Sequence, residues 1–129
     1  LDNSFGSSGI VITSAPSGFT NISASSVSME SDGKIVIGGT ADDLIILEFL
    51  VGRYNSNGSL DSSFGNNGLV TTQIGGGDDQ GRSIAIQSDG KIVLGGAHGT
   101  GIFSFALARY LASSTLILSC LTTALQAKY

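Results

Sequence analysis

The chain has 129 residues and a formal net charge of -4 at pH 7, with 12% charged and 41% hydrophobic residues. Disordered chains combine low hydrophobicity with high net charge, so this composition excludes disorder despite the many glycines and serines. The acidic balance argues against a nucleic-acid partner. The single cysteine, Cys120, excludes an internal disulfide framework and a Cys-rich zinc site. The longest apolar stretch, residues 115–125, is too short for a membrane span, which needs about 20 residues.

An internal repeat organises the chain. LDNSFGSSGIVIT at Leu1–Thr13 returns as LDSSFGNNGLVTT at Leu60–Thr72, and SDGKIVIGG at Ser31–Gly39 returns as SDGKIVLGG at Ser88–Gly96. EFLVGRY and SFALARY make a third matching pair in the same order. We therefore divide the chain into repeat 1 (residues 1–59), repeat 2 (residues 60–112) and an atypical C-terminal tail (residues 113–129).

Each repeat predicts four short strands. The first is a β-branched run after a glycine turn, GIVIT in repeat 1 and GLVTTQI in repeat 2. The second alternates apolar and polar residues, which puts Val27 and Met29 on one face. An Asp-Gly pair then predicts a tight hairpin of type I′, in which Gly33 or Gly90 supplies positive φ. The runs KIVIGGT and LIILEFLVGRY, with their counterparts in repeat 2, complete the set.

Four-stranded units of even size predict an all-β fold made of β-propeller blades, with one antiparallel blade per repeat. The motifs LDxSFGxxGxVxT, QSDGKIVLGG and FALARY resemble the delta-60 repeat family of bacterial proteins. That resemblance implies a propeller-like repeat architecture and no known chemistry. It is consistent with a bacterial protein that is secreted or held at the cell surface.

Two blades do not close a propeller, which typically has roughly four to eight. The sequence therefore predicts either a partial propeller continued by further repeats or a ring completed by self-association. In the second hypothesis, the N-terminal GIVIT run supplies the outer strand of a neighbour's second blade.

The tail departs from the repeat pattern, because it has no Asp, Gly or Asn where turns are expected. A shifted reading frame permits Leu-Asp followed by Asn-Gly at the spacing seen in LDSSFGNNG. We therefore favour a frameshifted third repeat over a dedicated tail, the alternative being an ordinary apolar strand or helix packed on the sheet.

Candidate binding residues gather on the loops at one end of the predicted blades, where the two repeats differ in length. The acidic pairs there could bind Ca²⁺ through carboxylate oxygens, or the loops could bind a glycan or a protein. Neither an EF-hand spacing nor a P-loop is present, so ordinary exposed turn residues are the simpler interpretation, and we expect no cofactor and no dedicated metal site. These residues are Asp42, Asp43, Asp78, Asp79 and His98.

A second set of residues recurs in both repeats and is expected to be structural. Asp2 and Asp61 suit Asx turns, and Phe5 and Phe64 suit anchors for the adjoining loop. Arg53 and Arg109 are expected to pair with a carboxylate, Asp2 or Asp61. Lys34 and Lys91 are expected to be solvated.

The leading functional hypothesis is a non-enzymatic repeat scaffold for binding or assembly. One alternative is an enzyme, a hydrolase or lyase whose site forms only when the ring closes. Another is a truncated gene product without a function of its own.

Overall fold

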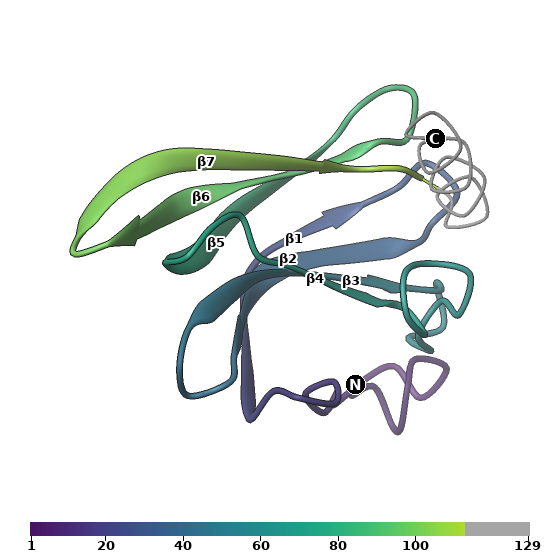
Figure 1. Cartoon of the computed structure of the whole chain (residues 1–129). Coiled ribbons are helices and arrows are strands. Elements are labelled where there is room, and N and C mark those ends of the chain that lie inside the picture. The colour runs from purple at the N-terminus through teal and green to yellow at the C-terminus, as the bar shows by residue number, and fades with distance from the viewer. Residues whose placement is uncertain (113–129) are drawn as a thin grey trace, which may run out of the picture.

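The computed structural model describes residues 1–112, and this part of the chain contains seven strands and no helix. They form two antiparallel sheets, one with the order β1-β2-β3-β4 and one with the order β5-β6-β7 (Figure 1). The all-β prediction is confirmed, and we call the two sheets blade 1 and blade 2. The strands are β1 Asn21–Met29, β2 Ile35–Asp42, β3 Leu47–Tyr54, β4 Leu69–Thr72, β5 Asp78–Ile86, β6 Ile92–Thr100 and β7 Ile102–Tyr110.

The blades are offset from the sequence repeats, because the outer strand of blade 1, β4, lies in repeat 2. The prediction of a strand at residues 9–13 was wrong for the isolated chain. Within residues 1–112, the one β-bridge of this segment joins Ser7 and Ile10, and Ile12 is 90% exposed. A strand needs a neighbour to satisfy its backbone groups, and no strand among residues 1–112 lies beside this one. Blade 2 likewise has three strands instead of four within the described residues, with β7 as an edge.

The β1–β2 and β5–β6 turns also differ from the prediction. A two-residue type I′ turn needs positive φ at both central residues, whereas only Gly33 (φ 89°) and Gly90 (φ 82°) have it here. The Gly33 N–H donates to the Glu30 carbonyl, and the Glu30 N–H donates to the carbonyl of Lys34. This pattern is a three-residue loop that ends in a left-handed glycine.

Alternation along the strands gives each blade two apolar faces. We call the face that carries Ile35 and Ile37 in blade 1, or Ile92 and Leu94 in blade 2, the leading face. The opposite face, which carries Val36 in blade 1 or Val93 in blade 2, is the trailing face. The core forms where the trailing face of blade 1 meets the leading face of blade 2. Its fully or nearly fully buried members are Val36, Phe49, Val51, Phe64, Ile84, Ile92 and Leu94.

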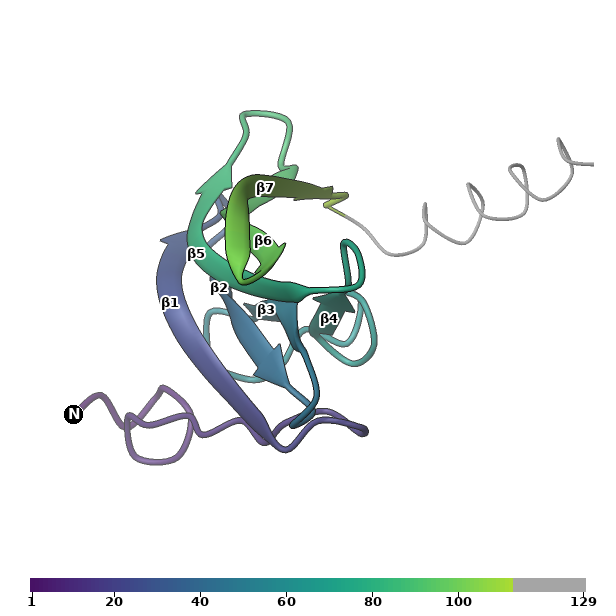
Figure 2. The ribbon, with the colours of Figure 1, turned by 60° about the vertical axis from the view of Figure 1, so that its left-hand side comes forward.

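Close backbone approach brings the two blades together beside β1 and β5, which lie next to each other (Figure 2). Both strands carry a bulge at equivalent positions, between Ala24 and Ser26 and between Gly81 and Ser83. The Gly81 N–H donates to Thr40 Oγ1 over 3.0 Å, and Ser25 Oγ donates to the Gly81 carbonyl over 2.5 Å. A Cβ added at Gly81 would lie 2.0 Å from the Gly39 carbonyl oxygen, so this approach requires glycine.

Within residues 1–112, no helix is long and apolar enough to cross a membrane. The frameshift hypothesis and Cys120 concern residues 113–129, which lie outside the described part of the chain.

The blade interface predicts unequal effects for two glycine substitutions. Gly81→Ala should lower the free energy of unfolding by about 1–3 kcal/mol, because its Cβ would meet backbone that cannot yield cheaply. Gly76→Ala is the control, since no heavy atom lies within 4 Å of its added Cβ and its φ is not positive. It should change stability by less than about 1 kcal/mol. Urea unfolding of both variants measures the difference, and equal midpoints would contradict the role given to Gly81.

Candidate functional site

The acidic residues predicted for the binding loops mostly support those loops. Asp42 Oδ1 accepts the Leu44 N–H over 2.7 Å. Asp43 Oδ1 accepts the N–H groups of Ile45 and Ile46 over 2.8 and 2.9 Å, and these bonds hold the pKa of Asp43 below its ordinary value. Asp78 Oδ1 accepts the Leu47 N–H over 3.0 Å and so ties the start of β5 to the start of β3. Three of the predicted carboxylates therefore cap loop backbone.

No group of three or more His, Cys, Asp or Glu side chains within residues 1–112 is arranged to hold a metal ion. Ca²⁺ binding on the acidic loops therefore stays a sequence-based prediction.

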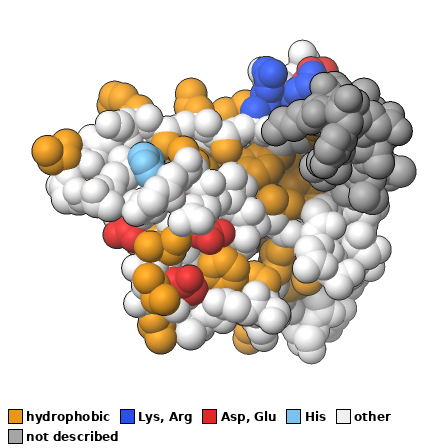
Figure 3. Space-filling view, in the orientation of Figure 1, with side chains coloured by type: hydrophobic (Ala, Val, Ile, Leu, Met, Phe, Trp, Pro, Cys, Tyr) orange, Lys and Arg blue, Asp and Glu red, His pale blue; other side chains and the backbone are white. Residues whose placement is uncertain are grey.

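The structure brings Asp79 and His98 together, a pairing that the sequence analysis missed. The two residues are register partners on β5 and β6. Asp79 is fully buried, and its Oδ1 lies 2.6 Å from His98 Nδ1 while its Oδ2 accepts the Ile74 N–H over 2.7 Å. The carboxylate orients the imidazole by its Nδ1 and leaves Nε2 for another partner. Figure 3 shows the single histidine of the chain at the surface, on the same side as several acidic side chains.

A buried ion pair holds the loop after β3. Arg53 Nε donates to Asp61 Oδ2 over 2.9 Å, and both residues are buried. The Arg53 guanidinium carbon lies 4.6 Å from the centroid of the Phe64 ring, within range of a cation–π interaction. Lys34 Nζ lies 3.2 Å from Asp61 Oδ2, so this lysine is engaged, contrary to the expectation that it is solvated.

These contacts set the ionisation of two acids near Arg53. Burial would raise the pKa of Asp61, but hydrogen bonds from Ser63 and Lys34 and the charge of Arg53 outweigh burial and lower that pKa to about 2. Burial dominates at Glu30 and raises its pKa, against the opposing charge of Arg53, whose Nη1 lies 3.6 Å from Glu30 Oε1.

The equivalent residues of the other repeat, Asp2 and Arg109, form no ion pair within residues 1–112. Asp2 is exposed and accepts hydrogen bonds from the N–H and hydroxyl of Ser4. Arg109 is exposed, and no acidic side chain among residues 1–112 pairs with it. Phe5 is half-buried, whereas its counterpart Phe64 is buried in the core between the blades.

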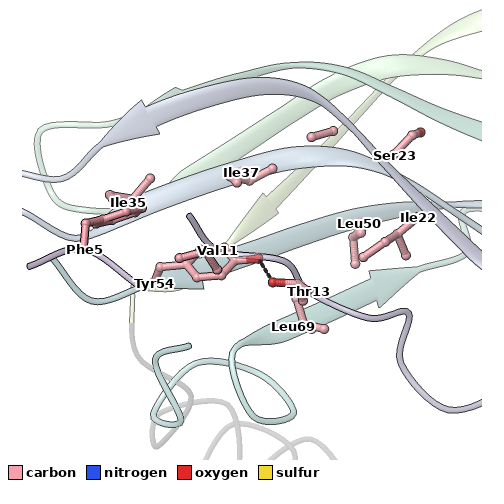
Figure 4. A pocket seen from close by; sticks show the side chains of 12 residues that line it. Phe5, Val11, Thr13, Ile22, Ser23, Ile35, Ile37, Leu50, Tyr54 and Leu69 are labelled. Carbon is pink, nitrogen blue, oxygen red and sulfur yellow. Dashed lines mark hydrogen bonds between the residues drawn. The ribbon is translucent and has the colours of Figure 1, made fainter. Parts of the chain in front are cut away.

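An open apolar pocket of about 350 Å³ lies on the leading face of blade 1 (Figure 4). Ile35, Ile37 and Tyr54 contribute to it from β2 and β3, and the N-terminal segment covers part of it with Val11 and Thr13. The hydroxyls of Thr13 and Tyr54 lie 2.8 Å apart. Sequence reasoning missed this pocket, because the pocket exists only where no second sheet packs on the leading face of blade 1 within residues 1–112.

Blade 2 shows what fills the same position. Ile92, Leu94 and Tyr110 are the counterparts of Ile35, Ile37 and Tyr54, and they pack against Phe49 and Val51 of blade 1. The pocket on the leading face of blade 1 therefore lies at the position that Phe49 and Val51 of blade 1 fill on the leading face of blade 2.

The Asp61 pKa predicts acid sensitivity with a defined sign. Because the folded-state pKa of about 2 lies below the ordinary 3.8, this carboxylate stabilises the fold above about pH 4 and loses that effect as the pH falls towards 2. The contribution is about 2 kcal/mol at neutral pH. Asp61→Asn should lose at least this much at pH 7, because it leaves Arg53 buried without its partner.

Urea unfolding of the wild type and of Asp61→Asn between pH 7 and pH 2 measures the effect. The difference between their free energies of unfolding should shrink as the pH falls across this range. Asp89→Asn removes an exposed carboxylate and should cost less than about 1 kcal/mol. If the difference in free energy of unfolding between the wild type and Asp61→Asn stays constant with pH, the lowered pKa of Asp61 is contradicted.

Comparison with known proteins supports the repeat architecture. The family described as "Domain of unknown function (DUF5122) beta-propeller" matches residues 30–64 and 87–116, and the two matches begin at equivalent positions of the two repeats. No curated protein and no solved structure matches the chain. The family match covers just over half of the chain and falls in both copies of the repeat, so the chain belongs to this β-propeller family of unknown function.

Proposed function

We propose that the chain is a non-enzymatic scaffold that assembles through the outer faces of its two blades. One comparison within the chain carries this proposal. Phe49 on the trailing face of blade 1 is fully buried, whereas its counterpart Phe105 on the trailing face of blade 2 is 103% exposed. The same sequence position is thus a core residue in one blade and a surface residue in the other.

The neighbouring positions follow the same rule. Val51 is buried and its counterpart Leu107 is exposed, again on the trailing faces. On the leading faces, Ile84 of blade 2 is 9% exposed and its counterpart Val27 of blade 1 is 66% exposed. Contiguous apolar surface of this kind is typical of interaction sites in soluble proteins. Both outer faces therefore have the composition of a blade interface, and no partner for either face lies within residues 1–112.

The resemblance to the delta-60 repeat family supports a further part of the proposal, that the scaffold is bacterial and acts in secretion or at the cell surface. A scaffold role is also consistent with a glycan or a protein as the ligand of the loops that carry Asp42 and Asp78.

The chain contains no tryptophan, so a single introduced one reports on the trailing face of blade 2. In Phe105→Trp, we expect the indole emission to shift to shorter wavelength as the protein concentration rises, because assembly takes the indole out of water. Ile45→Trp is the control, since Ile45 is 85% exposed on the β2–β3 loop and belongs to neither face. Fluorescence with a soluble quencher, paired with sedimentation velocity, gives the measurement. An indole in Phe105→Trp that stays as accessible as the one in Ile45→Trp at every concentration would refute the proposal.

The Asp79–His98 pair favours the second candidate, a hydrolase or lyase whose site forms on ring closure. A buried carboxylate that orients an imidazole is a common arrangement for a general base. Turnover of a generic ester or glycoside by the assembled protein, lost in His98→Gln with the assembly intact, would support this candidate. Equal rates for the two proteins would exclude a catalytic role for His98.

A further inference from the structure

We propose that residues 10–13 of one copy of this chain add a fourth strand to β7 of a second copy and so complete its blade 2. This inference rests on the proposed assembly function and names its partner, its strand and its register.

The N-terminal segment is already folded for this role. Residues 1–10 have the backbone hydrogen bonds of residues 60–69: Phe5 N–H to the Asp2 carbonyl matches Phe64 N–H to the Asp61 carbonyl, at 3.1 and 3.0 Å. Three further bonds in each loop match within 0.1 Å. The left-handed residues also coincide, at Gly6, Ser8 and Gly9 and at Gly65, Asn67 and Gly68. The loop thus has the conformation that precedes β4, although no strand follows it.

The segment also lies where such a strand belongs. In blade 2, Tyr110 Oη donates to Oγ1 of Thr72 in β4 over 3.0 Å. In blade 1, the counterpart Tyr54 makes the same contact with Thr13, the counterpart of Thr72, over 2.8 Å (Figure 4). Residues 10–13 therefore lie against blade 1 as β4 lies against blade 2. One edge of β4 pairs with β3 of the same blade. Residues 10–13 have no strand beside them at the corresponding edge within residues 1–112.

The repeat predicts the register of the missing pairing. β3 and β4 pair antiparallel with Phe49 opposite Thr72, Leu50 opposite Thr71, and Val51 opposite Val70. The same pairing between two copies sets Phe105 opposite Thr13, Ala106 opposite Ile12, and Leu107 opposite Val11. Within residues 1–112, β7 has a free edge and residues 10–13 have no strand beside them, and this pairing takes both out of water together, which satisfies both sets of backbone groups.

Faces and charges agree with this docking. The trailing face of the copy that supplies β7, with Phe105 and Leu107, would enter the pocket on the leading face of the copy that supplies residues 10–13, as Phe49 and Val51 pack on blade 2. The exposed Arg109 of the copy that supplies β7 would meet Asp2 of the other copy, as Arg53 meets Asp61. Both charges are unpaired within residues 1–112, so the interface supplies the partner that each lacks.

The interface is heterologous, since the two patches, residues 10–13 with the leading face of blade 1 and β7 with the trailing face of blade 2, are different surfaces of the chain. Repeated heterologous contacts close a ring when the rotation between copies allows it.

Disulfide cross-linking between two populations tests the register. One population carries Ile12→Cys and the other Ala106→Cys, both with Cys120→Ser so that no natural thiol competes. Directly opposed strand residues are within disulfide range, and diagonal neighbours about 7–8 Å apart are not. We expect a disulfide-linked pair of chains after mild oxidation. Ser104→Cys, two residues along β7, replaces Ala106→Cys in the control and should cross-link at least about tenfold less. Equal cross-linking by the two partners would overturn the proposal.

A charge exchange gives an independent second test. Arg109→Asp should weaken assembly in sedimentation at least about tenfold by placing two like charges together. Asp2→Arg added to the same chain should restore assembly. Failure of the double variant to recover would overturn the proposed ion pair. If the indole of Phe105→Trp becomes protected but no Ile12–Ala106 cross-link forms, the copies meet in another arrangement, and only this inference fails. If the indole stays exposed, the assembly function fails as well.

Discussion

A sheet with two apolar faces must be covered on both sides, and this constraint governs the rest of the structure. Each blade has alternating strands whose two faces both carry β-branched or aromatic residues, unlike a sheet with one polar face. Two blades have four faces between them, and a single interface covers only the inner two. The core cluster of Phe49, Val51, Ile92 and Leu94 is that interface. The open pocket and the exposed Phe105 lie on the two faces that remain.

The contrast between the N-terminal loop and the strand that should follow it separates local from non-local determinants. Residues 1–10 adopt the turn conformation of residues 60–69 because the bonds that define it are within the segment: the Asp2 carboxylate to Ser4, and the short-range backbone bonds. A strand has no such internal support, since its hydrogen bonds go to a neighbour. The motif that starts at Leu60 is therefore followed by β4, which pairs with β3. The same motif at Leu1 is followed by residues 10–13, which have no strand beside them within residues 1–112.

The same distinction explains how much the sequence could predict. Strand positions and the all-β class follow from alternation and from the internal repeat, and the repeat also indicated that Arg53 would have a carboxylate partner. The turn type did not follow, because Ser31-Asp32-Gly33 closes with one residue more than the Asp-Gly pair suggests. The contact between Asp79 and His98 depends on the register between β5 and β6, shifted by the bulge at Gly81. It has no counterpart in blade 1, where Ile22 and Ala41 occupy the equivalent positions, so the repeat could not reveal it.

Apolar residues alone do not specify how the outer strand of a blade aligns on the strand before it, because a slide by one pair of residues still buries carbon against carbon. In blade 1, Arg53 of β3 restricts that alignment through the loop that leads to β4. Its guanidinium is buried between Asp61 and the ring of Phe64, and a shift of the loop would leave a buried charge without its partner. Such a pair adds less to stability than to discrimination, since every wrong alignment is penalised by the unpaired charge. An Arg and an Asp at the matching positions of each repeat would give the outer strand of every blade the same alignment on the strand before it. On this argument, the polar residues of the repeat set the register of the outer strand within a blade, while the apolar residues supply the affinity between blades.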